Sequence, residues 1–241
     1  MQQILALVDF DNYASLNDVP GQKPKQHHVD RCLEQLISHI ISWSNDTGLN
    51  SGEIAIRLYG GWYDTREVDS RTEARCMIDT FCYNLQKRRG KFRILMDAAD
   101  SPLFSPSTTF TYTLQESNTS LNIKQKHLDQ CSTKSTCKTK TVYDWQKSGC
   151  PGCPISHEQF LKKFAQKNVD TAIVADTIYS TIQRKYKHII LVSADYDMLP
   201  GILFAVQQKQ PIVVFRNHPS VWFDYMLGDC DIHPEITPNY R

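Results

Sequence analysis

Two pairs of aspartates follow two short apolar segments of this 241-residue chain. Asp9 and Asp11 come after residues 4–8, Asp195 and Asp197 come shortly after residues 188–192, and Asp170 begins the segment before the second pair. Two carboxylates about 4 Å apart repel by roughly 4 kcal/mol at an effective dielectric of 20, so a cluster of them needs a cation. Mg²⁺ and Mn²⁺ prefer such oxygen ligands. The pattern therefore predicts a site for one of these two cofactors.

Capping is the alternative interpretation of each single aspartate. An aspartate after a strand is more often a helix cap or a turn residue than a metal ligand. On this ground Asp11 stays ambiguous, and Asp197 could cap the helix that follows. Asp176 lies six residues after Asp170, on a different face of the helix, and is a weaker candidate. Two pairs after two strands are harder to explain by capping, and they favour a metal site.

The segments around these aspartates alternate between strands and helices. Short apolar runs predict strands at residues 4–9, 54–59, 92–96, 188–192 and 211–215. A 3.6-residue apolar period predicts helices at 28–43, 72–88, 169–184 and 200–208, a capping box at Ser156 predicts another up to Gln166, and tail residues such as Trp222 predict a last one. This order indicates an α/β fold with a mostly parallel five-stranded sheet and helices on both faces. The carboxyl ends of parallel strands meet at one edge, where we expect the aspartates to converge.

The predicted helices also indicate a core. In the helix at 169–184 the apolar period selects six residues for burial: Ala172, Ile173, Ala175, Ile178, Tyr179 and Ile182. Three cysteines on apolar helix faces are expected to be core residues rather than ligands: Cys32, Cys76 and Cys82.

Three segments of the chain together resemble the NYN domain, a branch of the PIN-like nuclease superfamily. They read VDFDN, KNVDTAIVADTI and HIILVSADYDMLP, in this order, within residues 1–100 and 156–215. The resemblance implies a PIN-like three-layer fold and metal-dependent cleavage, usually of RNA. The family residues that line one acidic pocket correspond here to Asp9, Asn12, Asp170, Asp195 and Asp197. The chain departs from the family at Phe10, where glycine is frequent, and Asp11 is an additional carboxylate.

The segment at residues 101–155 has no apolar periodicity and divides the predicted core into residues 1–100 and 156–241. It contains four cysteines spaced C-x5-C-x12-C-x2-C, a set that favours a structural Zn²⁺ site: Cys131, Cys137, Cys150 and Cys153. The first pair is wider than the usual spacing, and His127 or His157 could replace one cysteine. Unpaired surface thiols or a redox pair are the alternatives. Zinc is favoured because it gives this segment a means of folding.

Basic residues could bring a nucleic acid to the site. The net charge of +1 gives no global signal, so any basic surface must be local. The candidates are Lys167, Lys138, Lys140, Arg88 and Arg89. The insertion lysines lie near Tyr143 and Trp145, a combination that suits phosphate contact with base stacking, although a solvated loop explains them equally well. RNA is the expected partner, and the sequence leaves DNA and a homo-oligomer open.

Two other functions fit parts of the sequence. A haloacid dehalogenase-like phosphatase would use Asp9 as nucleophile and Asp11 as general acid. Tyr13 stands where that family has threonine or valine, and the Ser/Thr motif expected after the second strand is missing. The other alternative is a non-catalytic module that binds RNA or a protein.

The cellular location is expected to be cytoplasmic. No apolar run reaches the length of a membrane span, so we expect no membrane partner. The first residues lack the pattern of a signal peptide. Clustered cysteines in a reducing compartment more often bind metal than form disulfides.

Overall fold

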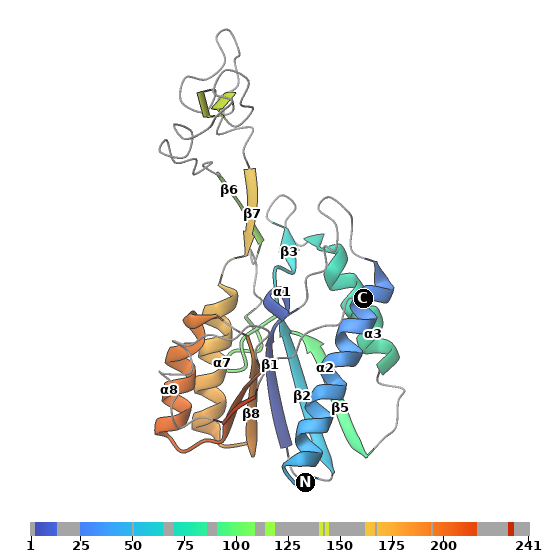
Figure 1. Ribbon diagram of the computed structural model, residues 1–241, viewed down its shortest axis with the longest axis vertical. Coiled ribbons are helices and arrows are strands. Elements are labelled where there is room, and N and C mark those ends of the chain that lie inside the picture. The colour runs from blue at the N-terminus through green and yellow to red at the C-terminus, as the bar shows by residue number, and fades with distance from the viewer. Residues whose placement is uncertain are drawn as a thin grey trace. The chain divides into compact units, whose positions relative to one another are not determined.

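The computed structural model divides the chain into two compact units, Met1–Leu114 with Gln166–Arg241 and Gln115–Ala165 (Figure 1). The insertion was predicted at residues 101–155, and the second unit begins and ends later. The described residues are 3–13, 25–49, 51–64, 70–85, 91–108, 114–118, 140–141, 143–144, 162–166, 168–193, 195–215 and 231–233.

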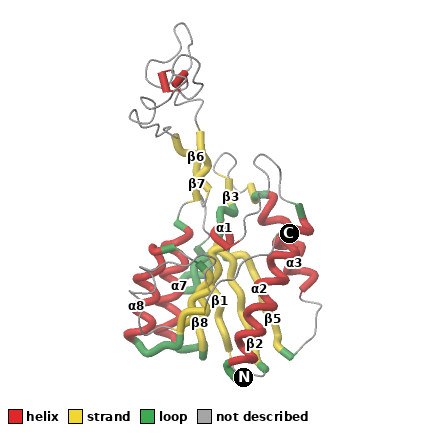
Figure 2. Tube along the Cα trace, in the orientation of Figure 1, coloured by secondary structure: helices red, strands yellow, loops and turns green. Residues whose placement is uncertain are grey.

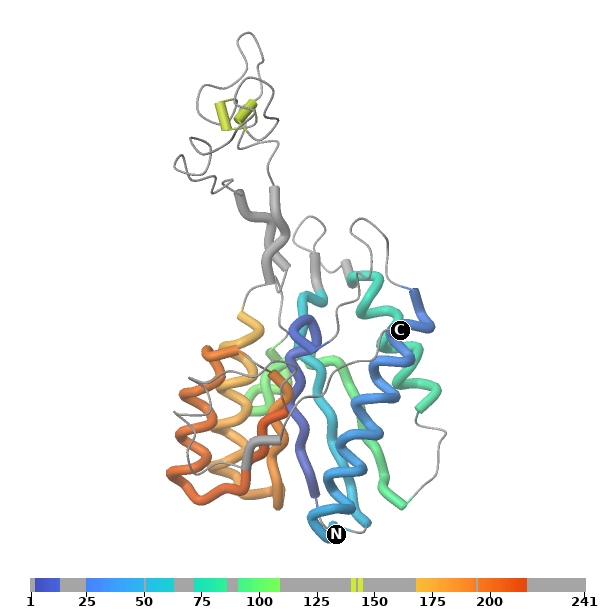
Figure 3. The backbone as a smooth tube through the Cα atoms, viewed as in Figure 1, coloured from blue at the N-terminus to red at the C-terminus, as the bar shows by residue number. Residues whose placement is uncertain are grey.

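A six-stranded sheet, all parallel over the described residues, forms the centre of the first unit. Its order is β10 (Asp231–His233), β9 (Ile212–Phe215), β8 (His188–Val192), β1 (Gln3–Asp9), β2 (Gly52–Tyr59) and β5 (Phe92–Ala98). The five predicted strands are confirmed, and β10 adds a short strand beside β9. Strand β1 lies between β2 and β8, with Ile4 opposite both Ile54 and His188 (Figure 3).

Helices cover both faces of this sheet (Figure 2). Alternate residues of β1 enter two separate cores, because successive side chains of a strand point to opposite faces. Ile4, Ala6 and Val8 pack with helices α2 (Gln26–Asp46) and α3 (Glu73–Leu85). Leu5 and Leu7 pack with α7 (Val169–Gln183) and α8 (Leu199–Gln207). The fold is therefore a three-layer α/β fold, consistent with the PIN-like architecture expected.

Helix α7 buries Ala172 and Ile173 as predicted, but the rest of its buried face differs from the predicted one. Ile182 is 60% exposed, whereas four polar residues are buried: Asp176, Thr177, Ser180 and Thr181. Close packing against α8 explains part of this change, since a Cβ added at Gly201 would lie 3.3 Å from the Cβ of Thr177. The hydroxyls of Thr177 and Thr181 donate to carbonyl oxygens one turn earlier in the helix, at 2.8 Å each, so their burial leaves no donor unpaired.

Two further expectations are wrong. Residues Lys162–Gln166 form strand β7, not the end of a helix, and β7 is hydrogen-bonded to β6 (Leu114–Asn118). Strand pairing satisfies the backbone here. Residues 156–161 of the predicted helix lie outside the described residues. Cys76 is exposed, while Cys32 and Cys82 are buried as expected.

Smaller elements complete the described chain: α1 (Phe10–Tyr13), the antiparallel pair β3 (Tyr63–Asp64) and β4 (Ser70–Arg71), and the 3₁₀ helix η1 (Tyr196–Met198). The predicted tail helix lies outside the described residues. Among the helices that are described, none combines the length and the apolar composition that crossing a membrane would require.

Candidate metal centre

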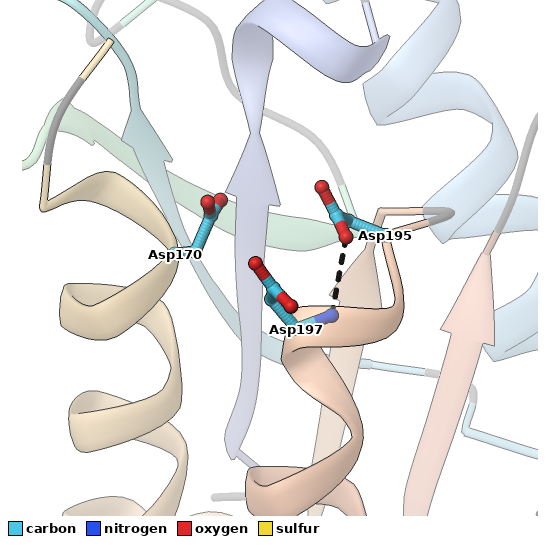
Figure 4. A group of neighbouring side chains, drawn as sticks. All are labelled: Asp170, Asp195 and Asp197. Atoms are coloured by element: carbon cyan, nitrogen blue, oxygen red, sulfur yellow. Dashed lines mark hydrogen bonds between the residues drawn. The ribbon is translucent and has the colours of Figure 1, made fainter.

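Three carboxylates converge beyond the carboxyl end of the sheet. Asp170 lies in the first turn of α7, while Asp195 and Asp197 come from the turn after β8. Each offers an oxygen, and these oxygens lie within 4.8 Å of one another. Figure 4 shows the three side chains around one common space. We call Asp170, Asp195 and Asp197 the carboxylate triad.

The backbone around the triad holds these side chains in place. Asp195 caps η1, and its Oδ1 accepts the N–H of Asp197 at 3.1 Å (Figure 4). Asn168 precedes α7 in the left-handed conformation, with φ of 63°, and Asp170 follows in the first turn. A negative charge is favourable there, because the first N–H groups of a helix carry partial positive charge.

The negative charges of the triad repel one another when no cation is bound. Burial, together with the charges of Asp195 and Asp197, raises the pKa of Asp170 above its ordinary value. No ion pair joins any of the three to a basic residue within the described part of the chain. A set of carboxylate oxygens with no thiolate or imidazole is the donor set of a hard cation such as Mg²⁺ or Mn²⁺. The triad therefore could hold a divalent cation.

Asp9 is a buried neighbour of the triad rather than a member of it. Its side chain is 4% exposed, and its carboxylate accepts the Asn12 N–H at 3.2 Å and the Ser193 hydroxyl at 3.4 Å. Burial raises its pKa, the hydrogen bonds from Asn12 and Ser193 lower it, and the charges of Asp170 and Asp11 raise it, with a net pKa of about 7. Asp9 therefore titrates near neutral pH, and its proton is coupled to the charge of the triad.

Ser193 is a positioning residue that the sequence analysis did not single out. Its hydroxyl donates to Asp9 and accepts the N–H of Asp195 at 3.1 Å, and its own N–H donates to the Phe215 carbonyl. It thus links the ends of β1, β8 and β9. A serine two residues before an aspartate, directly after a strand, is the sequence signal of such a turn.

The other residues of the first motif lie at different places. The carboxylate of Asp11 is exposed and accepts the Gly61 N–H at 3.2 Å, which ties α1 to the end of β2. Asn12 contributes its backbone N–H to Asp9. The structure therefore brings Asp9, Asp170, Asp195 and Asp197 together and places Asp11 outside the triad.

Asp176 belongs to a separate buried network. It is fully buried and accepts the Tyr59 hydroxyl at 2.5 Å and the Leu103 N–H at 2.7 Å, with Arg57 Nε at 3.8 Å. Arg57 in turn donates to the Ser101 carbonyl. These contacts fasten the chain after β5 to α7. A charged residue inside an otherwise apolar strand, as Arg57 is, was the sequence signal for such a network.

Most of the predicted substrate and zinc contacts lie outside the described residues. These are Lys167, Lys138, Arg88 and Arg89, together with Cys131, Cys137, Cys150 and Cys153. Lys140, in the second unit, is described, and it forms an ion pair with Asp144 one helical turn later.

Comparison of the chain with protein-family models, with curated proteins and with solved structures gave no match.

Proposed function

We propose that this protein is a Mg²⁺- or Mn²⁺-dependent nuclease that cleaves RNA internally. The observation that carries the proposal is the carboxylate triad, with oxygens within 4.8 Å of one another beyond the carboxyl ends of parallel strands. Ligands of open α/β sheets bind at this edge. Three carboxylates that have no basic partner among the described residues are destabilising unless a cation completes the site.

In this proposal Asp170, Asp195 and Asp197 hold the cation. Such an ion can activate water and stabilise the negative charge that develops on the leaving oxygen of a phosphodiester. Asp9 lies next to the triad, and the negative charge of Asp170 raises the pKa of Asp9. A cation at the triad would lower that pKa and favour the ionised carboxylate. Ser193 keeps Asp9 and Asp195 at a fixed separation during this change.

RNA is the proposed substrate because of the resemblance to the NYN domain. The residues that correspond to the acidic pocket of that family include all three triad members and Asp9. Asn12 has the further role of holding Asp9 through its backbone N–H.

The contacts of Asp9 and Asp11 weigh against a haloacid dehalogenase-like phosphatase. A covalent nucleophile has to reach the phosphorus atom, and Asp9 is 4% exposed with both of its oxygens hydrogen-bonded. The general acid of that mechanism, Asp11, accepts a backbone N–H from Gly61 instead. A purely structural module would not need three carboxylates at one edge that form no ion pair with any residue in the described part of the chain.

The test is cleavage of labelled RNA and DNA by the purified full chain in Mg²⁺, in Mn²⁺ and in EDTA. We expect RNA products with free metal and none in EDTA. Asp195→Asn should remove activity, since the amide oxygen can still accept the Asp197 N–H while the charge is lost.

Asp46→Asn is the matched control. Asp46 is exposed at the end of α2, next to the amino end of β2 and away from the triad. It should retain full activity when purified in the same way. Equal cleavage by the wild-type protein and Asp195→Asn, or undiminished cleavage in excess EDTA, would refute the proposal.

A further inference from the structure

A group of basic residues lies at the amino ends of β8 and β9, which is the end of the sheet opposite the triad. Arg184, Lys185 and Lys187 lie between α7 and β8, and Lys209 lies between α8 and β9. All four side chains are exposed. We call these four residues the basic edge. Because β8 has five residues, about 16 Å of strand separates this edge from the turn that carries the triad.

The basic edge has no acidic counterpart in its own chain segments. Neither residues 177–194 nor residues 198–223 contain an aspartate or a glutamate. Three other cations of the described first unit do form ion pairs: Arg57 with Asp176, Arg75 with Asp100 and Arg93 with Glu53. None of the four basic-edge residues forms an ion pair with any described residue.

Hydrogen bonds hold the two loops of the basic edge together. The buried Gln210 side chain donates to the carbonyl oxygens of Tyr186 at 3.2 Å and of Lys187 at 3.4 Å. The Lys187 N–H donates to the Gln3 carbonyl at 2.8 Å, which fixes the first loop to β1. Lys185 places its ammonium 5.4 Å from the centre of the Tyr186 ring. The positive charges are thus carried by a fixed backbone.

Two of the four cations occupy positions where glycine would be preferred. Arg184 has φ of 50° and Lys209 has φ of 57°, and both follow the ends of α-helices. Glycine adopts this conformation without strain. A positive charge after a helix is favourable, but this effect falls off within the last turn. It does not account for Lys185 and Lys187, which lie beyond that turn.

We infer that the basic edge binds the phosphate backbone of a single-stranded nucleic acid. Unpaired cations on a fixed scaffold suit a chain of regularly spaced phosphates, because each contact releases a condensed counterion. Under the proposed nuclease function, the strand held here is a distant part of the same substrate whose cleaved bond lies at the triad. Binding itself does not depend on that function.

The binding test uses the full chain and a fluorescent single-stranded RNA in EDTA, where no metal-dependent cleavage occurs. Lys185→Gln/Lys187→Gln removes two exposed charges without touching the strained positions. Each lost phosphate contact should reduce the slope of log affinity against log salt by about 0.7, so this variant should lose about 1.4. Arg31→Gln, at another exposed cation, on α2, is the control and should keep the wild-type slope.

A wild-type slope and affinity in the Lys185→Gln/Lys187→Gln variant would overturn the inference, and so would an equal loss in Arg31→Gln. A second measurement separates the inference from the nuclease proposal. In Mg²⁺ the double variant should lower kcat/KM for a long RNA and leave a trinucleotide unaffected. If the wild-type protein cleaves no RNA while the double variant still shows a smaller salt slope than the wild-type protein, the inference about the basic edge is supported and the nuclease proposal fails.

Discussion

Replacing Asp197 by asparagine should shift the free energy of unfolding in opposite directions with and without Mg²⁺. Asp197 is the exposed member of the triad, and it is the N-cap residue of neither η1 nor α8. In EDTA the substitution removes a charge that repels two neighbours and should stabilise the protein. In Mg²⁺ it removes a ligand and should make the variant less stable than the wild-type protein.

The distances give the size of the effect. Asp197 lies within 4.8 Å of Asp170 and of Asp195, and each pair repels by about 0.9 kcal/mol at the dielectric constant of water. Physiological salt, with a Debye length of about 8 Å, reduces the sum for two pairs to roughly 1 kcal/mol. The loss of a negative charge before α8 offsets part of this gain, which leaves about 0.5 kcal/mol. If the triad holds Mg²⁺, a Mg²⁺ concentration of 100 times its Kd would stabilise the wild-type protein by about 2.7 kcal/mol.

Urea denaturation of the wild-type protein and Asp197→Asn, each in EDTA and in excess Mg²⁺, measures both effects. Asp46→Asn is the control, because it makes the same change on an exposed carboxylate at the other edge of the sheet. The control should show no dependence on Mg²⁺. If the difference between wild-type protein and Asp197→Asn is the same in both solutions, the triad does not hold the cation.

Two further predictions concern buried carboxylates. The pKa of Asp9 is about 7 in the folded protein and near 3.8 when unfolded. The folded protein therefore binds the proton more tightly, and the free energy of unfolding in EDTA should fall as the pH rises between these two values, by up to about 1.4 kcal/mol per pH unit. Asp9→Asn should abolish that slope in urea titrations, and an unchanged slope would contradict the assignment. Asp176→Ala should cost about 3–5 kcal/mol and Tyr59→Phe about 1.5–3 kcal/mol in the same assay. Asp97→Asn, at an exposed partner of Arg57, should cost well under 1 kcal/mol, and equal losses would rule out a special role for Asp176.

Local patterns were enough to predict five strands of the central sheet and four of the helices of the first unit. The apolar runs that end at Asp9 and Val192 are strands in the structure, and the 3.6-residue periods are α2, α3, α7 and α8. Such patterns succeed because a strand buried on both faces and a helix buried on one face each require a distinct spacing of apolar residues. They also placed the aspartates after strand ends, where ligands of parallel sheets bind.

Local patterns failed where a partner distant in sequence changes the environment of a residue. The buried face of α7 follows from Gly201 on α8 and from Tyr59 on β2, neither of which is visible in the period of α7 itself. Strand β7 forms because β6 supplies its hydrogen bonds. Asp176 is buried for the same kind of reason, since Leu103 and Arg57 compensate its charge.

The sequence by itself determined that carboxylates stand at the ends of two buried strands and at the start of a helix. Only the tertiary structure decided which of them meet. The pairing of β8 with β1 puts Ser193 between Asp9 and Asp195, and the packing of α7 brings Asp170 to Asp195 and Asp197. Asp11 lies outside that group, and its carboxylate accepts the Gly61 N–H instead. The physical reason is that strand order in a parallel sheet depends on pairing between strands that are distant in sequence. The spacing of residues along the chain does not predict that order.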